Sequence, residues 1–203
     1  MKAIQCDTKA IYPSKVVCIG RNYVDHINEL NNDIPDQAVI FLKPNSAISS
    51  EIYDNAVDEI HYEGEISFLI ESGKISAVGF GLDLTKRGIQ SALKAKGLPW
   101  ERAKAFDNSA VFSEFRSFGG NIDKLRLELY INRNLVQQGG CDLMLFKPQS
   151  ILAEVKSFLT LEDGDVIMSG TPSGVGKVNG GDAFIGKVFE QEELIAEHQW
   201  VVK

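Results

Sequence analysis

Short runs of apolar and β-branched residues, separated by turn residues, follow one another along most of the chain. They predict strands at Lys15–Ile19, Gln37–Leu42, Ile60–Ile70, Ile75–Leu84, Lys124–Ile131, Leu135–Gln138, Asp165–Ser169 and Ala183–Phe189. Residues 132–134, Asn-Arg-Asn, stand between two of these runs and predict the tip of a hairpin.

Three segments are predicted to be helices. In Gln149–Leu159 the apolar residues recur at the spacing of one buried helix face. Arg87–Lys96 is a second helix candidate, because a glycine and then a proline follow it. A shorter helix is expected over Asn22–Leu30, with Asn22 as its N-cap. Since strands and helices do not alternate regularly, we expect a mixed α/β fold that is mainly β.

Length and charge exclude several classes of protein. The chain has 203 residues without an internal repeat or a linker-like stretch, so we expect one domain over residues 1–203. The net charge is −7, from 21 Lys and Arg against 28 Asp and Glu. Because a nucleic-acid-binding protein needs a basic face, this balance argues against nucleic acid as a partner. No apolar run approaches the ~20 residues that cross a bilayer, and no membrane association is expected.

The cysteines and the glycine-rich stretches argue against disulfides, a thiolate zinc site and the common nucleotide-binding motifs. Three widely spaced cysteines without a Cys-x-x-Cys pair do not indicate a disulfide framework or a thiolate zinc site, so a cytoplasmic location is expected. Gly170–Lys177 has one residue too many between its glycines for a phosphate-binding loop. Leu84 replaces the third glycine of a dinucleotide motif that would begin at Gly79.

Acidic residues recur at alternate positions in one of the predicted strands. Alternate residues of a strand share one face, which is formed here by His61, Glu63, Glu65 and Ser67. The backbones of the two glutamates would lie ~7 Å apart, so their side chains can converge on one cation. By itself this pattern is also typical of the solvated face of an edge strand.

A third carboxylate, Asp83, lies in an apolar run punctuated by glycines. A hairpin that folds Ile75–Leu84 back on Ile60–Ile70 would bring Asp83 beside the two glutamates. Three carboxylates with water completing the shell suit Mg²⁺ or Mn²⁺ rather than zinc. The alternative is that Asp83 is a turn residue or the N-cap of the helix that follows.

The other candidate residues are a histidine pair and several polar groups. His26 and Glu29 are three residues apart on a predicted helix, so the carboxylate could orient the imidazole as an acid–base group, although such a pair is also common on surfaces. Lys104 lies in a locally apolar segment that suits an anion-binding lysine. Three further polar candidates are Arg87 and Gln90, one turn apart and suited to a substrate carboxylate, and Thr171 in a Gly-Thr-Pro turn. Each of these could equally be a solvated or turn residue.

Several motifs occur in a fixed order along most of the chain. They are residues 17–23 (VCIGRNY) with His26 and Glu29, 41–44 (FLKP), 61–65 (HYEGE), 82–87 (LDLTKR), 96–100 (KGLPW) before Lys104, 164–167 (GDVI) and 170–172 (GTP). Together they resemble the fumarylacetoacetate hydrolase family, specifically its short, single-domain branch. Two departures are Gly64, where a larger apolar residue is frequent, and residues 108–111 (NSAV), where many relatives have Cys-Pro after the serine.

The resemblance implies a fumarylacetoacetase-like β-roll or pseudo-barrel with a few short helices, and a homodimer. It implies that Mg²⁺ or Mn²⁺ is held by Glu63, Glu65 and Asp83. It also implies that His26 and Glu29 form an acid–base dyad on a lid ordered by substrate, and that Lys104 acts at the reacting centre. Three positions match substrate-contacting residues of the family, namely Arg87, Gln90 and Thr171.

The family's substrates share a 2-oxo acid that chelates the cation, which stabilises the enolate formed when a bond at C3 breaks. We therefore expect a small anionic 2-oxo acid as substrate. The leading hypothesis is hydrolysis of the C3–C4 bond of an acylpyruvate, or decarboxylation or tautomerisation of oxaloacetate by the same groups. Isomerisation or decarboxylation of a 2-hydroxyhepta-2,4-diene-1,7-dioate is the alternative within the family. A non-catalytic protein that binds a 2-oxo acid is the alternative from another class.

Overall fold

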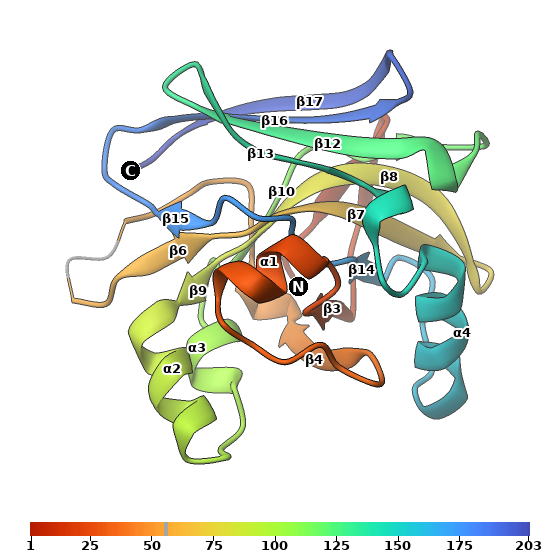
Figure 1. The fold of residues 1–203 in the computed structure, drawn as a ribbon. Helices are drawn as coiled ribbons and strands as arrows, with labels where there is room; N and C mark the ends of the chain where they lie inside the picture. Colours follow the sequence, from red (N-terminus) through yellow and green to blue (C-terminus); the bar gives the residue numbers. More distant parts are fainter. Residues whose placement is uncertain (55–56) are drawn as a thin grey trace.

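Strands dominate the computed structural model, which describes residues 1–54 and 57–203 (Figure 1). The strands are β1 (Ile4–Cys6), β2 (Lys9–Ile11), β3 (Lys15–Gly20), β4 (Val39–Pro44), β5 (Ile48–Ser49), β6 (Ile60–Tyr62), β7 (Gly64–Glu71), β8 (Lys74–Asp83), β9 (Thr85–Lys86), β10 (Ala110–Phe112), β11 (Arg116–Ser117), β12 (Leu125–Ile131), β13 (Asn134–Gly140), β14 (Val166–Met168), β15 (Gly176–Lys177), β16 (Ala183–Glu190) and β17 (Glu193–Val201). The helices are α1 (Val24–Glu29), α2 (Arg87–Ala95), α3 (Glu101–Lys104) and α4 (Pro148–Phe158), with 3-10 turns η1 (Asn45–Ala47), η2 (Ile122–Lys124) and η3 (Cys141–Leu143). The prediction of a mixed, mainly β fold with few helices is confirmed.

Two curved sheets pack against each other and enclose the core. The larger has the order β4-β3-β14-β7-β8-β10-β5, with β11 also paired to β8. The second, β13-β12-β16-β17, lies across β7 and β8 (Figure 1). Their buried side chains, among them Phe80 and Phe184, form one apolar cluster. A Cβ at Gly186 would lie 2.4 Å from Phe80, so this glycine allows the close approach of the two sheets.

The predicted hairpin of Ile60–Ile70 with Ile75–Leu84 exists, but its first strand is interrupted at Glu63. β7 and β8 pair antiparallel, with Gly64 opposite Leu82. β6 belongs instead to a three-stranded sheet with β15 and β9. The expectation that His61 shares one continuous strand face with the glutamates is therefore wrong, and His61 pairs with Glu59 at 2.8 Å.

The strand and helix predictions hold with small shifts, apart from one cap. The α1 helix begins after Tyr23, and its predicted cap Asn22 is instead buried, with its side-chain amide donating to the carbonyls of Phe146 and Ser169. At the predicted hairpin tip, Asn132 and Arg133 both have positive φ, at 50° and 69°, as a tight two-residue turn requires. Helix α3 and strand β17 were not predicted, because α3 is a single turn and polar residues at 197–199 interrupt the apolar pattern of β17. The short strands β1, β2, β5, β9, β10, β11 and β15 were not predicted either.

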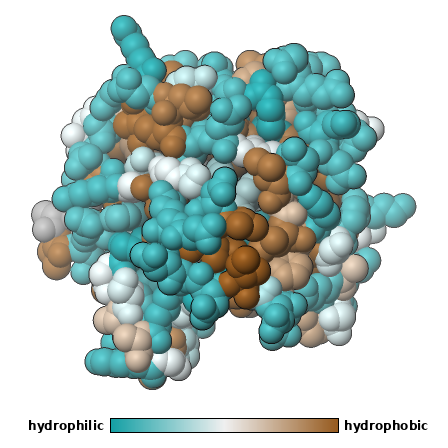
Figure 2. Space-filling view, viewed as in Figure 1, coloured by the Kyte–Doolittle hydropathy of each residue, from teal (hydrophilic) through white to brown (hydrophobic). Residues whose placement is uncertain are grey.

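Most of the face drawn in Figure 2 is hydrophilic, with apolar side chains gathered near its middle. None of the helices in the described parts of the chain has the length and apolar character needed to cross a bilayer. The structure describes three free cysteines, of which Cys18 and Cys141 are buried.

Candidate metal centre and active site

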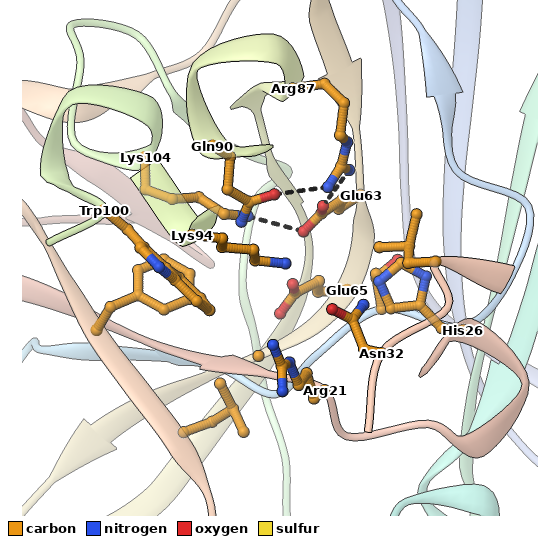
Figure 3. Close-up of a pocket in the computed structure, with 15 residues that line it drawn as sticks. Arg21, His26, Asn32, Glu63, Glu65, Arg87, Gln90, Lys94, Trp100 and Lys104 are labelled. Atoms are coloured by element: carbon orange, nitrogen blue, oxygen red, sulfur yellow. Dashed lines mark hydrogen bonds and ion pairs between the residues drawn. The ribbon is translucent and has the colours of Figure 1, made fainter. Parts of the chain in front are cut away.

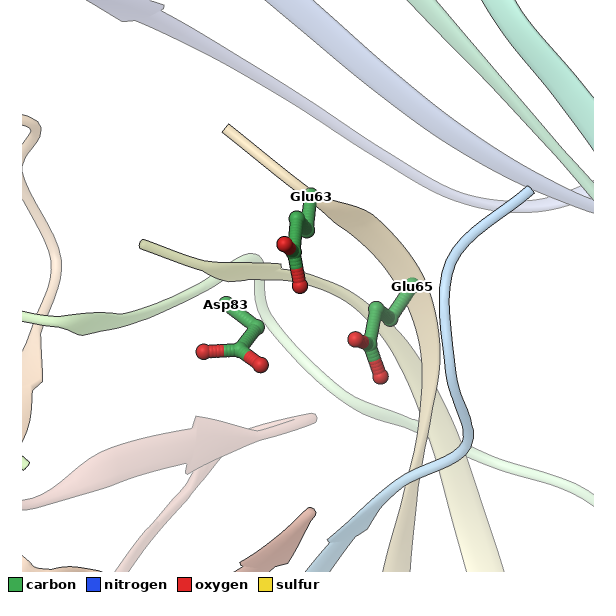
Figure 4. A group of neighbouring side chains, drawn as sticks. All are labelled: Glu63, Glu65 and Asp83. Carbon is green, nitrogen blue, oxygen red and sulfur yellow. The ribbon is translucent and has the colours of Figure 1, made fainter. Parts of the chain in front are cut away.

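Three buried carboxylates, from β7, β8 and the residue before β7, lie close together on the larger sheet (Figure 4). Glu63 lies at the break before β7, Glu65 is on β7, and Asp83 ends β8. Each offers one oxygen, and these oxygens lie within 4.8 Å of one another. The antiparallel register brings them together, since the Asp83 N–H donates to the Glu63 carbonyl at 2.9 Å. The alternative, that Asp83 is the N-cap of the next helix, is wrong, because the N-cap of α2 is Lys86.

The carboxylate triad, as we call Glu63, Glu65 and Asp83, is almost completely withdrawn from solvent. The exposed fractions are 6%, 1% and 1%. Burial, followed by the charges of Asp83 and Glu63, raises the pKa of Glu65 well above its ordinary value. The buried Asp83 Oδ1 accepts no hydrogen bond, although Lys43 Nζ lies 2.9 Å away. Buried carboxylates are costly unless they are paired or bound to a metal, so the triad and its oxygen donors fit a hard divalent cation.

Lys104 reaches the triad from helix α3. Its ammonium donates to Glu63 Oε2 at 2.8 Å, Asp83 Oδ2 at 2.6 Å and Thr85 Oγ1 at 2.6 Å. Burial alone would lower the pKa of Lys104, but Asp83 and then Glu63 raise it above its ordinary value. The two carboxylates thus favour the ammonium form of Lys104.

A second lysine, Lys43, lies behind the triad and was not predicted from the sequence as a site residue. It is completely buried at the end of β4. Its ammonium donates to the backbone carbonyls of Leu84, Lys104 and Ser109 and pairs with Asp83 at 2.9 Å. Its sequence signals are its place in the 41–44 (FLKP) motif and its position between a predicted strand and a proline. Lys43 thereby links β4 to the segments that carry Asp83 and Lys104.

Helix α1 carries the predicted acid–base pair beside the triad. His26 is 6% exposed, and its Nδ1 lies 3.1 Å from Glu29 Oε2. Glu29 Oε1 also accepts a hydrogen bond from the Gly174 N–H at 3.0 Å, which ties α1 to the loop before β15. The imidazole faces the same pocket as Glu63 and Glu65 (Figure 3).

The predicted substrate contacts line this pocket, but their polar groups are already engaged. Arg87 donates to Glu63 Oε1 at 2.5 Å and to Gln90 Oε1 at 2.7 Å. Although burial would raise the pKa of Glu63, Lys104 and then Arg87 hold it well below its usual range. The Thr171 hydroxyl donates to the Gly64 carbonyl at 2.9 Å and accepts from Gln137 Nε2 at 2.8 Å. These residues therefore organise the carboxylates as well as the pocket wall.

The pocket also has lining residues that were not predicted as site residues. They are, among others, Arg21, Asn32, Phe41, Lys94 and Trp100. Arg21 and Trp100 occur in the sequence motifs, but nothing local distinguishes Asn32 or Lys94. The cavity measures about 30 Å³, which is space for roughly two water molecules. A substrate must therefore displace part of the wall, to which α1 contributes His26 and its C-cap Leu30.

Comparison with known proteins assigns the chain to a family. The model of the fumarylacetoacetate hydrolase C-terminal domain matches residues 15–198. The oxaloacetate tautomerase YcgM of Escherichia coli is 38% identical over 190 residues, which cover 84% of this chain and 87% of that protein. The human mitochondrial oxaloacetate tautomerase FAHD1 is 35% identical over 184 residues, covering 82% and 83%.

Solved structures agree in fold. The yeast protein ynq8, a fumarylacetoacetate hydrolase family protein, superposes with a TM-score of 0.81 at 31% identity, covering 95% of this chain and 94% of that one. Fumarylpyruvate hydrolase from Pseudomonas aeruginosa has a TM-score of 0.90 over 99% of this chain and 95% of its own, at 24% identity, which is a likeness of fold. The family match over most of the chain and the identities above 30% settle the assignment: the chain belongs to the fumarylacetoacetate hydrolase family of enzymes.

Proposed function

We propose that the chain is a divalent-metal-dependent enzyme that interconverts the enol and keto forms of a 2-oxo acid, with oxaloacetate as substrate. The observation that carries the proposal is one pocket containing the triad's two glutamates, the ammonium of Lys104 and the imidazole of His26. The curated relatives YcgM and FAHD1 are named as oxaloacetate tautomerases, which supports oxaloacetate.

Glu63, Glu65 and Asp83 would hold the cation, which we propose to be Mg²⁺ or Mn²⁺. A hard divalent cation supplies charge that stabilises the negative oxygen of an enolate. The fumarylpyruvate hydrolase of similar fold was crystallised with Mn²⁺ and pyruvate, which supports this choice of metal and of a 2-oxo acid. Arg87 and the Gly170 N–H, which donates to Glu65 Oε2 at 2.6 Å, hold two of the carboxylates in place.

His26 would move the proton. In the change from enol to keto form, O2 loses one proton and C3 gains one, so no other reactant is consumed. If the Nδ1–H of His26 donates to Glu29, then Nε2 is the free base that takes the proton and returns it. Glu29 would fix this tautomer and stabilise the imidazolium that forms transiently.

Lys104 would act as a fixed charge rather than a proton donor. Its contacts with Glu63 and Asp83, at 2.8 and 2.6 Å, hold the ammonium in one position. Such a preorganised cation stabilises negative charge that develops on the substrate. Arg87, Gln90 and Thr171 are proposed to contact the substrate once it enters, exchanging some of their present hydrogen bonds.

The test is the decay of the ultraviolet absorbance of enol-oxaloacetate, measured with purified protein and Mg²⁺ against the same metal without protein. We expect Glu63→Gln to lower the enzymatic rate by about 100-fold or more, since loss even of an outer partner of a metal ligand costs 10–100-fold. The matched control is Glu71→Gln, which changes an exposed glutamate at the other end of β7 and should leave the rate unchanged. Equal rates for Glu63→Gln and the parent would refute the metal assignment.

Hydrolysis of an acylpyruvate is the second candidate, favoured by the His26–Glu29 pair. A base oriented in this way can also activate water for attack on a C4 carbonyl, with rupture of the C3–C4 bond and release of pyruvate. Pyruvate release from acetylpyruvate, without enol-oxaloacetate turnover above the metal background, would favour this reaction instead. A hydroxylated heptadienedioate as a third substrate would test the isomerase alternative.

We also propose that the protein forms a homodimer and is located in the cytoplasm. Several large apolar side chains in the described chain are exposed, including Tyr12, Ile34, Leu42 and Leu143. Figure 2 shows apolar side chains gathered near the middle of one face. Patches of this kind are typical of interaction surfaces. Light scattering coupled to gel filtration would test the dimer.

A further inference from the structure

We propose that Arg21 and Lys94 form a binding site for a second carboxylate of the substrate, and so select a four-carbon 2-oxo dicarboxylate over an acylpyruvate whose acyl end is uncharged. The inference deepens the proposed function and rests on it, because it assigns the far end of the same pocket. Neither the family comparison nor the motifs give these two residues a role.

The two cations come from distant elements and meet at one pocket. Arg21 directly follows β3, with a φ of 55°, and Lys94 lies in the last turn of α2. Both line the pocket that contains His26, Glu63 and Glu65. Figure 3 shows the nitrogen ends of both side chains turned toward the interior of this pocket.

These cations differ from the other two in the pocket by having no anionic partner. Arg87 and Lys104 are both bonded to Glu63. Within residues 1–54 and 57–203, neither Arg21 nor Lys94 forms an ion pair or a side-chain hydrogen bond, and Arg21 Nε is buried without a partner. A buried guanidinium nitrogen without an acceptor costs free energy, so the geometry favours an anion that binds between them.

Electrostatics and packing agree with this reading. Burial, followed by the charges of Arg21 and Arg87, lowers the pKa of Lys94 to about 8, as expected where cations face each other without an intervening anion. The Lys94 ammonium also lies 5.1 Å from the centre of the Trp100 ring, which holds it against the pocket wall.

The competing occupant of this end is an apolar acyl group. Trp100 and Phe41 form an aromatic pair with ring centres 5.8 Å apart, and both line the pocket. An apolar group would shield the two cations from water without pairing them, which is unfavourable. A carboxylate accepts from both, and its charge-assisted hydrogen bonds are the strong kind. The charge balance therefore favours the dicarboxylate.

The test uses two stable 2-hydroxy acids that differ only at the far end. In malate a carboxylate occupies the position that a methyl group takes in 2-hydroxybutyrate. Binding of each to the Mg²⁺-loaded protein is measured by calorimetry at pH 7, and inhibition of oxaloacetate turnover is measured in parallel. We expect the parent to bind malate at least 10-fold more tightly than 2-hydroxybutyrate, since a hydrogen bond to a charged group contributes roughly that factor or more.

Two variants test the residues. Lys94→Met should remove most of the malate preference and leave 2-hydroxybutyrate affinity nearly as before, whereas Lys94→Arg should keep the preference. Arg21→Asn, which tolerates the positive φ, should act like Lys94→Met. The matched control is Lys96→Met, an exposed lysine at the end of the same helix, which should retain the parent's preference. Thermal unfolding of each variant separates misfolding from loss of binding.

The outcomes separate this inference from the proposed function. Equal affinities for the two acids in the parent, or a malate preference that survives in both Lys94→Met and Arg21→Asn, would overturn the dicarboxylate site. If the parent still turns over enol-oxaloacetate in that case, the proposed function stands. A malate preference that depends on Lys94 and Arg21, found in a protein without oxaloacetate turnover, would support the site and refute the proposed reaction.

Discussion

Lys43→Met should destabilise the protein strongly although Lys43 lies outside the substrate pocket. The substitution keeps an apolar stem of similar length but removes the ammonium from a site with no access to solvent. Asp83 then loses one of its two lysine partners, and the carbonyls of Leu84, Lys104 and Ser109 lose a donor. The variant thus asks whether this buried lysine holds the metal-binding segments together.

The magnitude follows from the partners that remain. Removal of one member of a buried ion pair costs about 3–5 kcal/mol. Because Lys104 still pairs with Asp83, we expect a loss near the middle of that range, about 4 kcal/mol. For a chain of this size 1 kcal/mol corresponds to about 2–4 °C in Tm, so Tm should fall by roughly 8–16 °C.

The assay is calorimetric unfolding in the presence of a chelator, so that bound metal does not contribute. Lys74→Met, which changes an exposed lysine on β8, is the control and should shift Tm by less than about 2 °C. In the double variant Lys43→Met with Asp83→Asn, the two losses should not add, with a coupling of about 0.5–3 kcal/mol. A Tm within 2 °C of the parent for Lys43→Met, or strict additivity, would refute this reasoning.

Three further predictions concern the site itself. Chelation should abolish turnover of enol-oxaloacetate, and Mg²⁺ or Mn²⁺ should restore it and raise the stability by about 2.7 kcal/mol at 100 times the Kd; an unchanged Tm on adding metal would contradict the carboxylate triad as its site. His26→Ala should lower kcat by about 10²–10⁴-fold while metal affinity, measured by calorimetry, stays the same, and Glu29→Gln should lower kcat less; loss of metal affinity in His26→Ala would speak against a proton-transfer role. Since the pKa of Lys94 is about 8, its charge is present below that pH and lost above it, so malate affinity should fall as pH rises through 8; in Lys94→Arg the fall should move to higher pH, and an identical profile would exclude Lys94 as its origin.

The local pattern was sufficient for most elements near the site. Apolar alternation predicted the β7–β8 hairpin, and the glycine and proline that follow α2 predicted its end within one residue. Both follow from the sequence because a strand or helix face is set by residues close along the chain. The interruption at Glu63 was not predictable in this way, because pairing of β6 with β9 and β15 is a long-range choice.

For the three carboxylates, the sequence predicted the residues of the site but not that they are buried. The residue types and the spacing of Glu63 and Glu65 indicated an oxygen-ligand site, but a solvated strand face was equally compatible with them. What distinguishes the two is burial, which depends on groups from distant parts of the chain that pack around the carboxylates, such as Lys104 of α3 and the Gly170 N–H. For Asn22 the local pattern was misleading. Its residue type and position predicted a helix cap, but its side chain forms hydrogen bonds with the backbone of Phe146 instead.

By itself, the sequence determined the mainly β class, the positions of most strands and helices, and the residues able to bind a hard cation or move a proton. Only the tertiary structure decided which charges are neutralised and which are left over. It pairs Lys43 with Asp83 and Lys104 with Glu63, and leaves Arg21 and Lys94 free of an anion in the chain that it describes. The reason is physical: periodicity reports which face of an element is buried, whereas the pairing of charges depends on register and on contacts between residues far apart in sequence.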